Sequence, residues 1–155
     1  MKYWLIKSEH DCYSIDDLKR DRKTAWTGVR NYQARNFMNS MEIGDEILFY
    51  HSGGDKHNPT GVYGTARVSG KAKPDETQFD KGDDHYDPKA KPEKPIWYCV
   101  DVAFVSKFQH PVTLVEIKHD PKLSGIPVAQ TGSRLSVQPV SEKHFKYIVA
   151  LSQEK

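Results

Sequence analysis

The sequence predicts an α+β domain, a small, closed or nearly closed β-barrel of about five or six strands flanked by three or four short helices. Short runs rich in aromatic and β-branched residues recur along the chain and are typical of strands. These strands do not alternate regularly with helices, which argues against a doubly wound parallel sheet. The length of 155 residues suits one domain with an ordinary core, so we expect a single domain over residues 1–155.

Local signals in the first quarter of the chain predict a strand followed by a helix. Residues 3–7 form the first predicted strand. Ser14 begins a helix that ends near Asp21, because Asp17 three residues later gives a capping-box-like start. Residues 24–30 are a strand or turn with a glycine break.

The next segments predict the centre of the sheet. Asn31 is a favourable N-cap for a second helix, which extends to about Met41. Residues 45–51 are too continuously apolar to be half exposed, so they form a buried central strand. Residues 62–68 return as another strand.

Residues 71–95 differ from both flanks, with four prolines and thirteen charged side chains of mixed sign. We expect a long loop here, and long loops in compact domains are usually functional or disordered. Beyond it, residues 97–105 are a strong strand and residues 114–117 a short helical turn. Residues 135–140 are a short extended element ended by proline, and Ser141 caps a final amphipathic helix.

Composition restricts partners and compartment. The net charge of +2, from 23 basic and 21 acidic residues, excludes only an indiscriminate polyelectrolyte mode of binding. Two isolated cysteines fit a reducing compartment, and no apolar run approaches the roughly 20 residues that span a bilayer. We expect a cytoplasmic protein, or a nuclear one in a eukaryote, without a membrane partner. No exposed apolar stripe is evident, which favours a monomer.

Patterns typical of catalysis are absent from the sequence. It contains no GxGxxG, GxxxxGK[ST], GxSxG or HExxH motif, and no Cys/His spacing typical of zinc. His51 and Ser52 are neighbours, but adjacent residues of a strand point to opposite faces. The acidic run at 83–87 is more typical of a hydrated loop than of a metal site. We therefore predict no enzyme activity, no catalytic residue, no metal and no cofactor.

Two features suit recognition of a nucleobase. Trp26 precedes Gly28 closely and offers a ring face, and stacking of a base on such a face is worth roughly 1–3 kcal/mol. The alternative is a core tryptophan. Arg30, Arg35 and Asn31 surround a predicted helix N-terminus, where free N–H groups favour phosphate. The alternative for Arg35 is local capping or a salt bridge.

Six segments in chain order resemble the EVE domain family. The similarity runs from about residue 2 to the last helix. One departure is His10, which stands where the family usually has proline and which alters the turn after the first strand. The matching segments are residues 3–9, 26–37, 49–52, 77–80, 86–88 and 134–139.

The resemblance implies a PUA-like barrel, related to the YTH readers of methylated adenine. It also implies a nucleic-acid partner and a flipped, modified base, with 5-substituted cytosine in DNA as the leading candidate. By the same resemblance, Trp26 is one wall of an aromatic cage, and Lys7 and Ser8 lie at the base edge. Asn31 and Arg30 anchor the pocket rim or a phosphate.

Further residues complete the predicted site, as pocket floor, as lid or as hydrogen-bonding groups, each with a purely structural alternative. The predicted base-binding pocket consists of Trp26, Lys7, Ser8, Asn31, Tyr50, His51, Ser52, Phe79, Asp80, Ser136 and Gln138. The predicted phosphate site consists of Arg30, Arg35 and Arg134.

Two alternatives remain beside the reader of modified DNA. PUA-like barrels also serve RNA, and a requirement for the 2′-hydroxyl would separate the two ligands. An enzyme acting on modified nucleotides needs a titrating group in the pocket, for which His51, Glu9 and Asp80 are the candidates.

Overall fold

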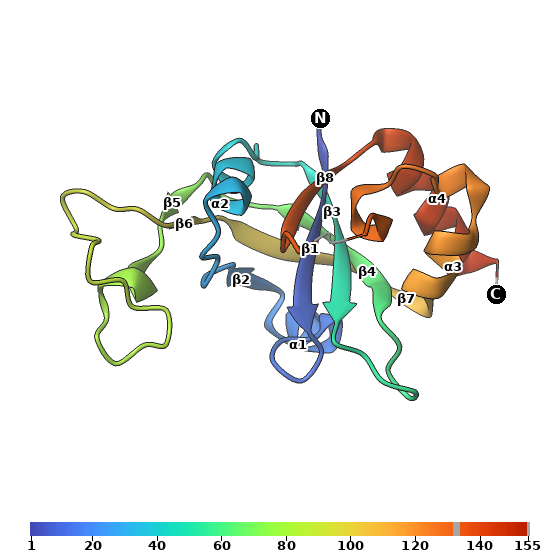
Figure 1. Ribbon diagram of the computed structural model, residues 1–155, viewed down its shortest axis with the longest axis horizontal. Helices are drawn as coiled ribbons and strands as arrows, with labels where there is room; N and C mark the ends of the chain where they lie inside the picture. The colour runs from blue at the N-terminus through green and yellow to red at the C-terminus, as the bar shows by residue number, and fades with distance from the viewer. Residues whose placement is uncertain (132–133, 155) are drawn as a thin grey trace.

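The computed structural model describes residues 1–131 and 134–154, and its longer strands form one curled six-stranded sheet with four α-helices around it (Figure 1). The predicted α+β class is therefore confirmed. In chain order the elements are β1 (Tyr3–Glu9), α1 (Ile15–Asp21), β2 (Lys23–Ala25), α2 (Tyr32–Asn39), β3 (Glu46–Ser52), β4 (Gly61–Val68), β5 (Lys73–Pro74), η1 (Glu76–Phe79), β6 (Tyr98–Cys99), β7 (Asp101–Thr113), α3 (Leu114–His119), η2 (Pro121–Leu123), η3 (Pro127–Ala129), β8 (Val137–Val140) and α4 (Glu142–Gln153).

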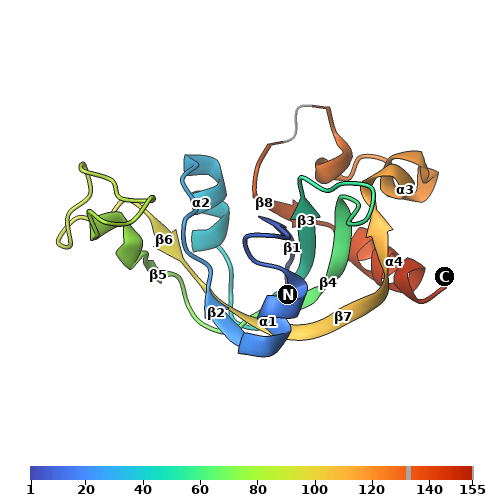
Figure 2. The same cartoon turned by 90° about the horizontal axis from the view of Figure 1, so that it is seen from below.

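The sheet is an open half-barrel. Its strand order is β2-β7-β4-β3-β1-β8, so β2 and β8 form the two edges, while β5 and β6 pair separately. β1 runs parallel to β3, and the other neighbouring strands of the sheet are antiparallel. Figure 2 shows β7 sweeping along one side of the molecule from β6 to α3. Within the described residues, no helix is both long and apolar enough to cross a membrane.

Helix starts lie where capping chemistry predicts them. The hydroxyl of Ser14 accepts a hydrogen bond from the backbone N–H of Asp17 and completes a capping box, and the side chain of Asn31 accepts one from Ala34. β7 extends well beyond the predicted end of this strand at Val105. The sequence did not indicate the second half as a strand because it is polar and contains Pro111. Its pairing with β4 is interrupted around that proline, where a missing N–H costs no ladder hydrogen bond.

Alternating side chains of β1 and β3 enter two separate cores on opposite faces of the sheet. On the face toward α1 and α2, the α2-side core includes Trp4, Ile6, Leu18, Trp26, Met38, Ile47 and Phe49. On the face toward α3 and α4, the α4-side core includes Tyr3, Leu5, Leu48, Tyr50, Ile117, Phe145 and Ile148. A residue and its chain neighbour therefore serve different cores.

The segment 71–95 projects at the end of the molecule opposite α3 and α4 (Figure 1, Figure 2). It is bonded into the fold through Gln78, whose side chain is fully buried. The Gln78 amide nitrogen donates to the carbonyls of Asp75 and Trp97, and its oxygen accepts from the N–H groups of Ile96 and Trp97. A buried amide with these four bonds holds the base of the segment in one arrangement.

Candidate functional site

A cavity of about 530 Å³ opens beside the segment that carries Trp26. This volume lies within the roughly 300–1,000 Å³ typical of small-ligand pockets. Four parts of the chain supply its walls: the end of β1, the turn after it, the segment from β2 to α2, and single residues from two distant loops. The lining residues are Lys7, Ser8, Cys12, Tyr13, Thr24, Ala25, Trp26, Thr27, Gly28, Val29, Arg30, His85 and Ser136.

Trp26 belongs both to the core and to the cavity wall. Its side chain packs edge-on against Phe49, with ring centroids 5.5 Å apart, and against Tyr13 at 6.0 Å. Its backbone N–H donates to the carbonyl of Val100 at 2.8 Å. Only 9% of Trp26 is exposed, so the ring is held rigidly while part of it borders the cavity.

The three tryptophans differ in what their indole N–H groups do. Trp4 donates to the carboxylate of Asp45 at 3.0 Å, and Trp97 donates to that of Asp87 at 2.8 Å. The indole N–H of Trp26 has no hydrogen-bond partner within residues 1–131 and 134–154. A largely buried indole usually finds a partner, so this N–H distinguishes Trp26 from the other two tryptophans.

Asp75 fastens the segment 71–95 to the cavity wall. The carboxylate is fully buried and accepts from the backbone N–H of Gly28 at 2.8 Å, from Thr77 and from Arg30 at 3.1 Å. Burial by itself raises the pKa of Asp75, but the hydrogen bonds outweigh burial and leave the pKa below its usual value. Gly28 adopts φ +88°, a conformation that disfavours a side chain.

Arg30 lies in the cavity wall, but its N–H groups donate hydrogen bonds to other groups of the protein. Its Nε and one Nη2 proton donate to the carbonyl of His85 at 3.0 and 2.8 Å, and the other Nη2 proton donates to Thr77 at 2.9 Å. The two Nη1 protons donate to Val29 and Asp75. A guanidinium has five N–H donors, so none is left for the phosphate that the sequence predicted here. The geometry makes Arg30 a clamp.

Arg35 also acts as a clamp, outside the cavity. It donates to the carbonyl of Ile96 at 3.0 Å and to the side chain of Asn36. Its guanidinium lies 4.9 Å from the ring centre of Tyr32, which in turn stacks on Trp97. This arrangement joins α2 to the chain just after the long loop. Arg35 therefore has a local structural role, as the alternative to phosphate binding predicted.

Of the predicted pocket, four residues line the cavity: Trp26, Lys7, Ser8 and Ser136. Burial lowers the pKa of Lys7, whose ammonium lies 5.6 Å from the ring centre of Tyr50. The other predicted members lie elsewhere among the described residues. These are Asn31, Tyr50, His51, Ser52, Phe79, Asp80 and Gln138 in the predicted pocket, and Arg35 and Arg134 in the predicted phosphate site.

Most of the displaced residues have a local physical reason. Tyr50 faces the α4-side core, and Asn31 caps α2. Asp80 accepts from the backbone of Gly82 in an exposed turn, and the Gln138 amide donates to the carbonyl of Leu135. Arg134 is exposed and borders no part of the cavity. Their roles in binding stay predictions without support from this geometry.

His51 is buried as a neutral ring. Its Nε2 accepts a hydrogen bond from the backbone N–H of Ile15 at 3.1 Å, and the ring stacks on Tyr63 with centroids 4.0 Å apart. Burial, helped by the nearby charge of His10, lowers the pKa of His51 to about 4. The lone pair that a general base would use is thus occupied in supporting the start of α1.

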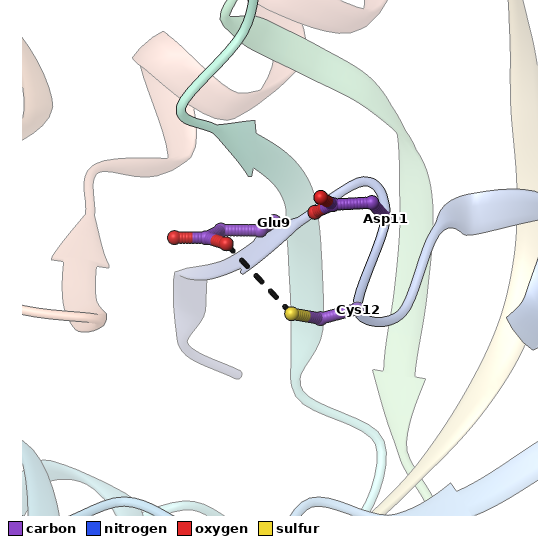
Figure 3. A group of neighbouring side chains, drawn as sticks. All are labelled: Glu9, Asp11 and Cys12. Atoms are coloured by element: carbon purple, nitrogen blue, oxygen red, sulfur yellow. Dashed lines mark hydrogen bonds between the residues drawn. The ribbon is translucent and has the colours of Figure 1, made fainter.

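A small acidic group lies at the cavity rim, where β1 ends. Figure 3 shows Glu9, Asp11 and Cys12 around one turn, with the thiol directed to the Glu9 carboxylate at 3.7 Å. Their potential ligand atoms lie within 4.8 Å of one another, and all three residues are exposed. Desolvation and the charges of Glu9 and Asp11 raise the pKa of Cys12, which disfavours the thiolate that a metal would require.

Sequence reasoning missed several wall residues. Cys12 and Tyr13 lie in the turn after β1. Because the end of β1 was predicted to enter the site, the turn that follows it could have been predicted to line the site as well. His85 carried no such signal, because it lies in a charged run 55 residues after Arg30. Its ring nevertheless lies against Gly28, with Nε2 2.9 Å from where a β-carbon of that residue would be.

Comparisons with known proteins agree with the geometry. The family model of the EVE domain matches residues 2–151. Human thymocyte nuclear protein 1 is 39% identical over 171 residues, which cover 99% of this chain and 75% of that protein. A crystal structure from Pseudomonas syringae superimposes with a TM-score of 0.92 and 43% identity, covering 97% of this chain and 99% of that one.

A further solved structure is a complex with DNA. Human THYN1 protein in complex with 5-methylcytosine-containing DNA superimposes with a TM-score of 0.87 and 38% identity. The match covers 100% of this chain and 99% of that one, so it includes every element that surrounds the cavity.

Proposed function

This chain belongs to the EVE domain family, and we propose that it is a non-catalytic module that takes a flipped 5-substituted cytosine of DNA into the cavity beside Trp26. The fold is the PUA-like α+β fold that the sequence predicted, and its sheet is an open half-barrel with β2 and β8 at the edges rather than a closed or nearly closed barrel. The proposed compartment is the cytoplasm, or the nucleus of a eukaryotic cell. The observation that carries the proposal is a cavity bordered by an indole whose N–H is unused, in a chain that matches a DNA-bound relative over its whole length.

The physical demands of base reading match what the cavity offers. Extruding a base from a duplex costs a few kcal/mol, which stacking and edge hydrogen bonds must restore. Trp26 supplies a rigid ring for stacking, and its free N–H supplies one donor. Ser8 and Ser136 supply further polar groups, suited to the adjacent O2 and N3 acceptors of cytosine, and Lys7 lines the same wall. Apolar wall atoms from Val29 and Tyr13 suit a methyl group.

The groups that the sequence offered for chemistry on a bound base are not placed for it. The lone pair of His51 is engaged and the residue lies outside the wall. The thiol of Cys12 has a raised pKa, and burial raises the pKa of Cys99 to about 11. Glu9 and Asp80 are exposed and lie outside the wall. These features support binding without turnover.

The test is a fluorescence-anisotropy titration of two duplexes that differ only in one 5-methyl group on a central cytosine. We expect tighter binding of the methylated duplex and a loss of about 1–3 kcal/mol of binding free energy in Trp26→Ala, the worth of one stacked base. Val115→Ala serves as control, because Val115 is exposed on α3, away from the cavity. Equal affinity of the wild-type protein for both duplexes would refute base reading.

A third arm separates DNA from RNA. An RNA duplex of the same sequence with one 5-methylcytosine tests for recognition of the 2′-hydroxyl. We expect weaker binding of the RNA. Tighter binding of the RNA would transfer the proposal to an RNA-binding module built on the same cavity.

A further inference from the structure

We propose that His85 reads the exocyclic amine of the bound base and thereby separates 5-methylcytosine from thymine. This inference rests on the proposed function. The two bases share the 5-methyl group and differ along one edge: at position 4 cytosine has an amine that donates and thymine a carbonyl that accepts, and N3 accepts in cytosine but carries a proton in thymine. A pocket that senses only ring and methyl cannot tell them apart, so a group at the base edge is needed, and an acceptor facing position 4 is one that reads the amine directly.

His85 reaches the cavity from the segment 71–95 and is held at two points. Its carbonyl accepts from Nε and Nη2 of Arg30 at 3.0 and 2.8 Å. Its backbone N–H donates to the carboxylate of Asp83 at 2.8 Å, and its ring Nδ1 lies 3.0 Å from the same oxygen. Backbone and ring are therefore both oriented by charged partners.

The contact with Asp83 determines which ring nitrogen carries the proton. An ionised carboxylate only accepts hydrogen bonds, so in the neutral ring Nδ1 is the donor and the lone pair lies on Nε2. This Nε2 has no hydrogen-bond partner in the described part of the chain, and it lies against Gly28 on the cavity wall. The wall thus presents one oriented acceptor.

The other polar groups of the wall make this acceptor distinctive. The indole N–H of Trp26 is a donor, and the hydroxyls of Ser8 and Ser136 can act as donors, whereas Nε2 in this tautomer can only accept. These donors suit the acceptors O2 and N3 of cytosine. The amine at position 4 needs an acceptor, which Nε2 of His85 supplies. Thymine would bring its O4 against this nitrogen, two acceptors facing each other, which leaves both unsatisfied.

The experiment compares 5-methylcytosine with 5-methyl-2-pyrimidinone, which lacks only the amine. Each is placed once in a DNA duplex opposite an abasic site, so that no base pair must be broken in either. Thymine in the same position is the third ligand. We expect wild-type protein to bind 5-methylcytosine about tenfold more tightly than the other two, a difference of about 1.4 kcal/mol.

Two substitutions of His85 test whether its Nε2 causes the preference for a base that carries the 4-amino group. His85→Phe keeps a ring over Gly28 but no acceptor, and we expect its amine preference to fall below about twofold. It should keep the preference for methylated over plain cytosine, which a general disturbance of the wall would remove. His85→Gln, whose amide oxygen can take the place of Nε2, should restore most of the amine preference.

The outcomes separate this inference from the proposed function. If the wild-type protein does not distinguish methylated from plain cytosine, both fail. If it does, but shows no amine preference, or if His85→Phe retains that preference, the role of His85 is refuted and base reading stands. Thermal melts of each variant establish that it is folded, and loss of folding in His85→Phe leaves the His85→Gln comparison to decide.

Discussion

The two faces of the central sheet are built from alternate residues of the same strands, yet neighbouring side chains on the two faces have different roles. On the α4-side, Leu48 and Ile148 are fully buried under helices. On the α2-side, Phe49 supports Trp26, and beyond that ring lies a cavity of about 530 Å³. The difference teaches that a single strand can stabilise the fold with one side chain and support a binding site with the next.

Truncation in the α4-side core should give the largest loss of stability. Leu48→Ala removes a fully buried side chain from the α4-side core, and we expect the free energy of unfolding to fall by about 3 kcal/mol. DNA affinity, measured where the variant is folded, should be unchanged. Urea unfolding and anisotropy titration together check this. A marked loss of affinity in the folded variant would show that the two faces are coupled.

Replacing an indole by a phenyl ring should affect stability differently at Trp4 and Trp26, the two tryptophans of the α2-side core. Trp4→Phe leaves the buried carboxylate of Asp45 without one of its donors, which should cost about 1–3 kcal/mol of stability. Trp26→Phe removes no hydrogen bond within residues 1–131 and 134–154, so it should cost less stability than Trp4→Phe while DNA affinity falls. If both variants lose the same stability, the indole of Trp26 has an internal partner after all.

Acid should lower the free energy of unfolding through protonation of His51, by less per pH unit than the substitution Leu48→Ala lowers it. Its pKa is lowered by burial to about 4 in the folded state, against about 6.5 when unfolded. The unfolded chain therefore binds the proton more readily, and stability is lost as pH falls between these values. The slope should reach at most about 1.4 kcal/mol per pH unit.

His51→Gln is the matched variant for this titration, since an amide keeps an acceptor for Ile15 but does not ionise in this range. Urea midpoints at pH 7 and pH 5 measure the difference. An equal fall in stability for wild type and His51→Gln would mean that other groups cause the acid sensitivity.

The same contrast explains how much the sequence could predict. Caps are local, so the starts of α1 and α2 followed from Ser14 and Asn31. Trp26 followed from its small polar neighbours and the glycine beside it. In β3, however, the residues from Ile47 to Tyr50 are all apolar and buried. Without alternation, nothing in that run shows which side chain faces which core.

Contacts between distant segments were beyond sequence reasoning. Arg30 looked like a phosphate ligand because its guanidinium is suited to one, and only the folded loop reveals that its donors are taken by Asp75, Thr77 and His85. His85 entered the wall for the same reason. Such pairings depend on how a long loop closes, which local propensity does not encode.

The central claim is that the cavity beside Trp26 receives the base, and indole NMR tests it most directly. A ¹⁵N-labelled sample gives one indole N–H signal for each of the three tryptophans. On titration with a duplex that contains one 5-methylcytosine, we expect the Trp26 signal to shift strongly, while those of Trp4 and Trp97 stay near their positions because their N–H groups are bound to carboxylates. Binding that leaves the Trp26 signal in place would contradict the account.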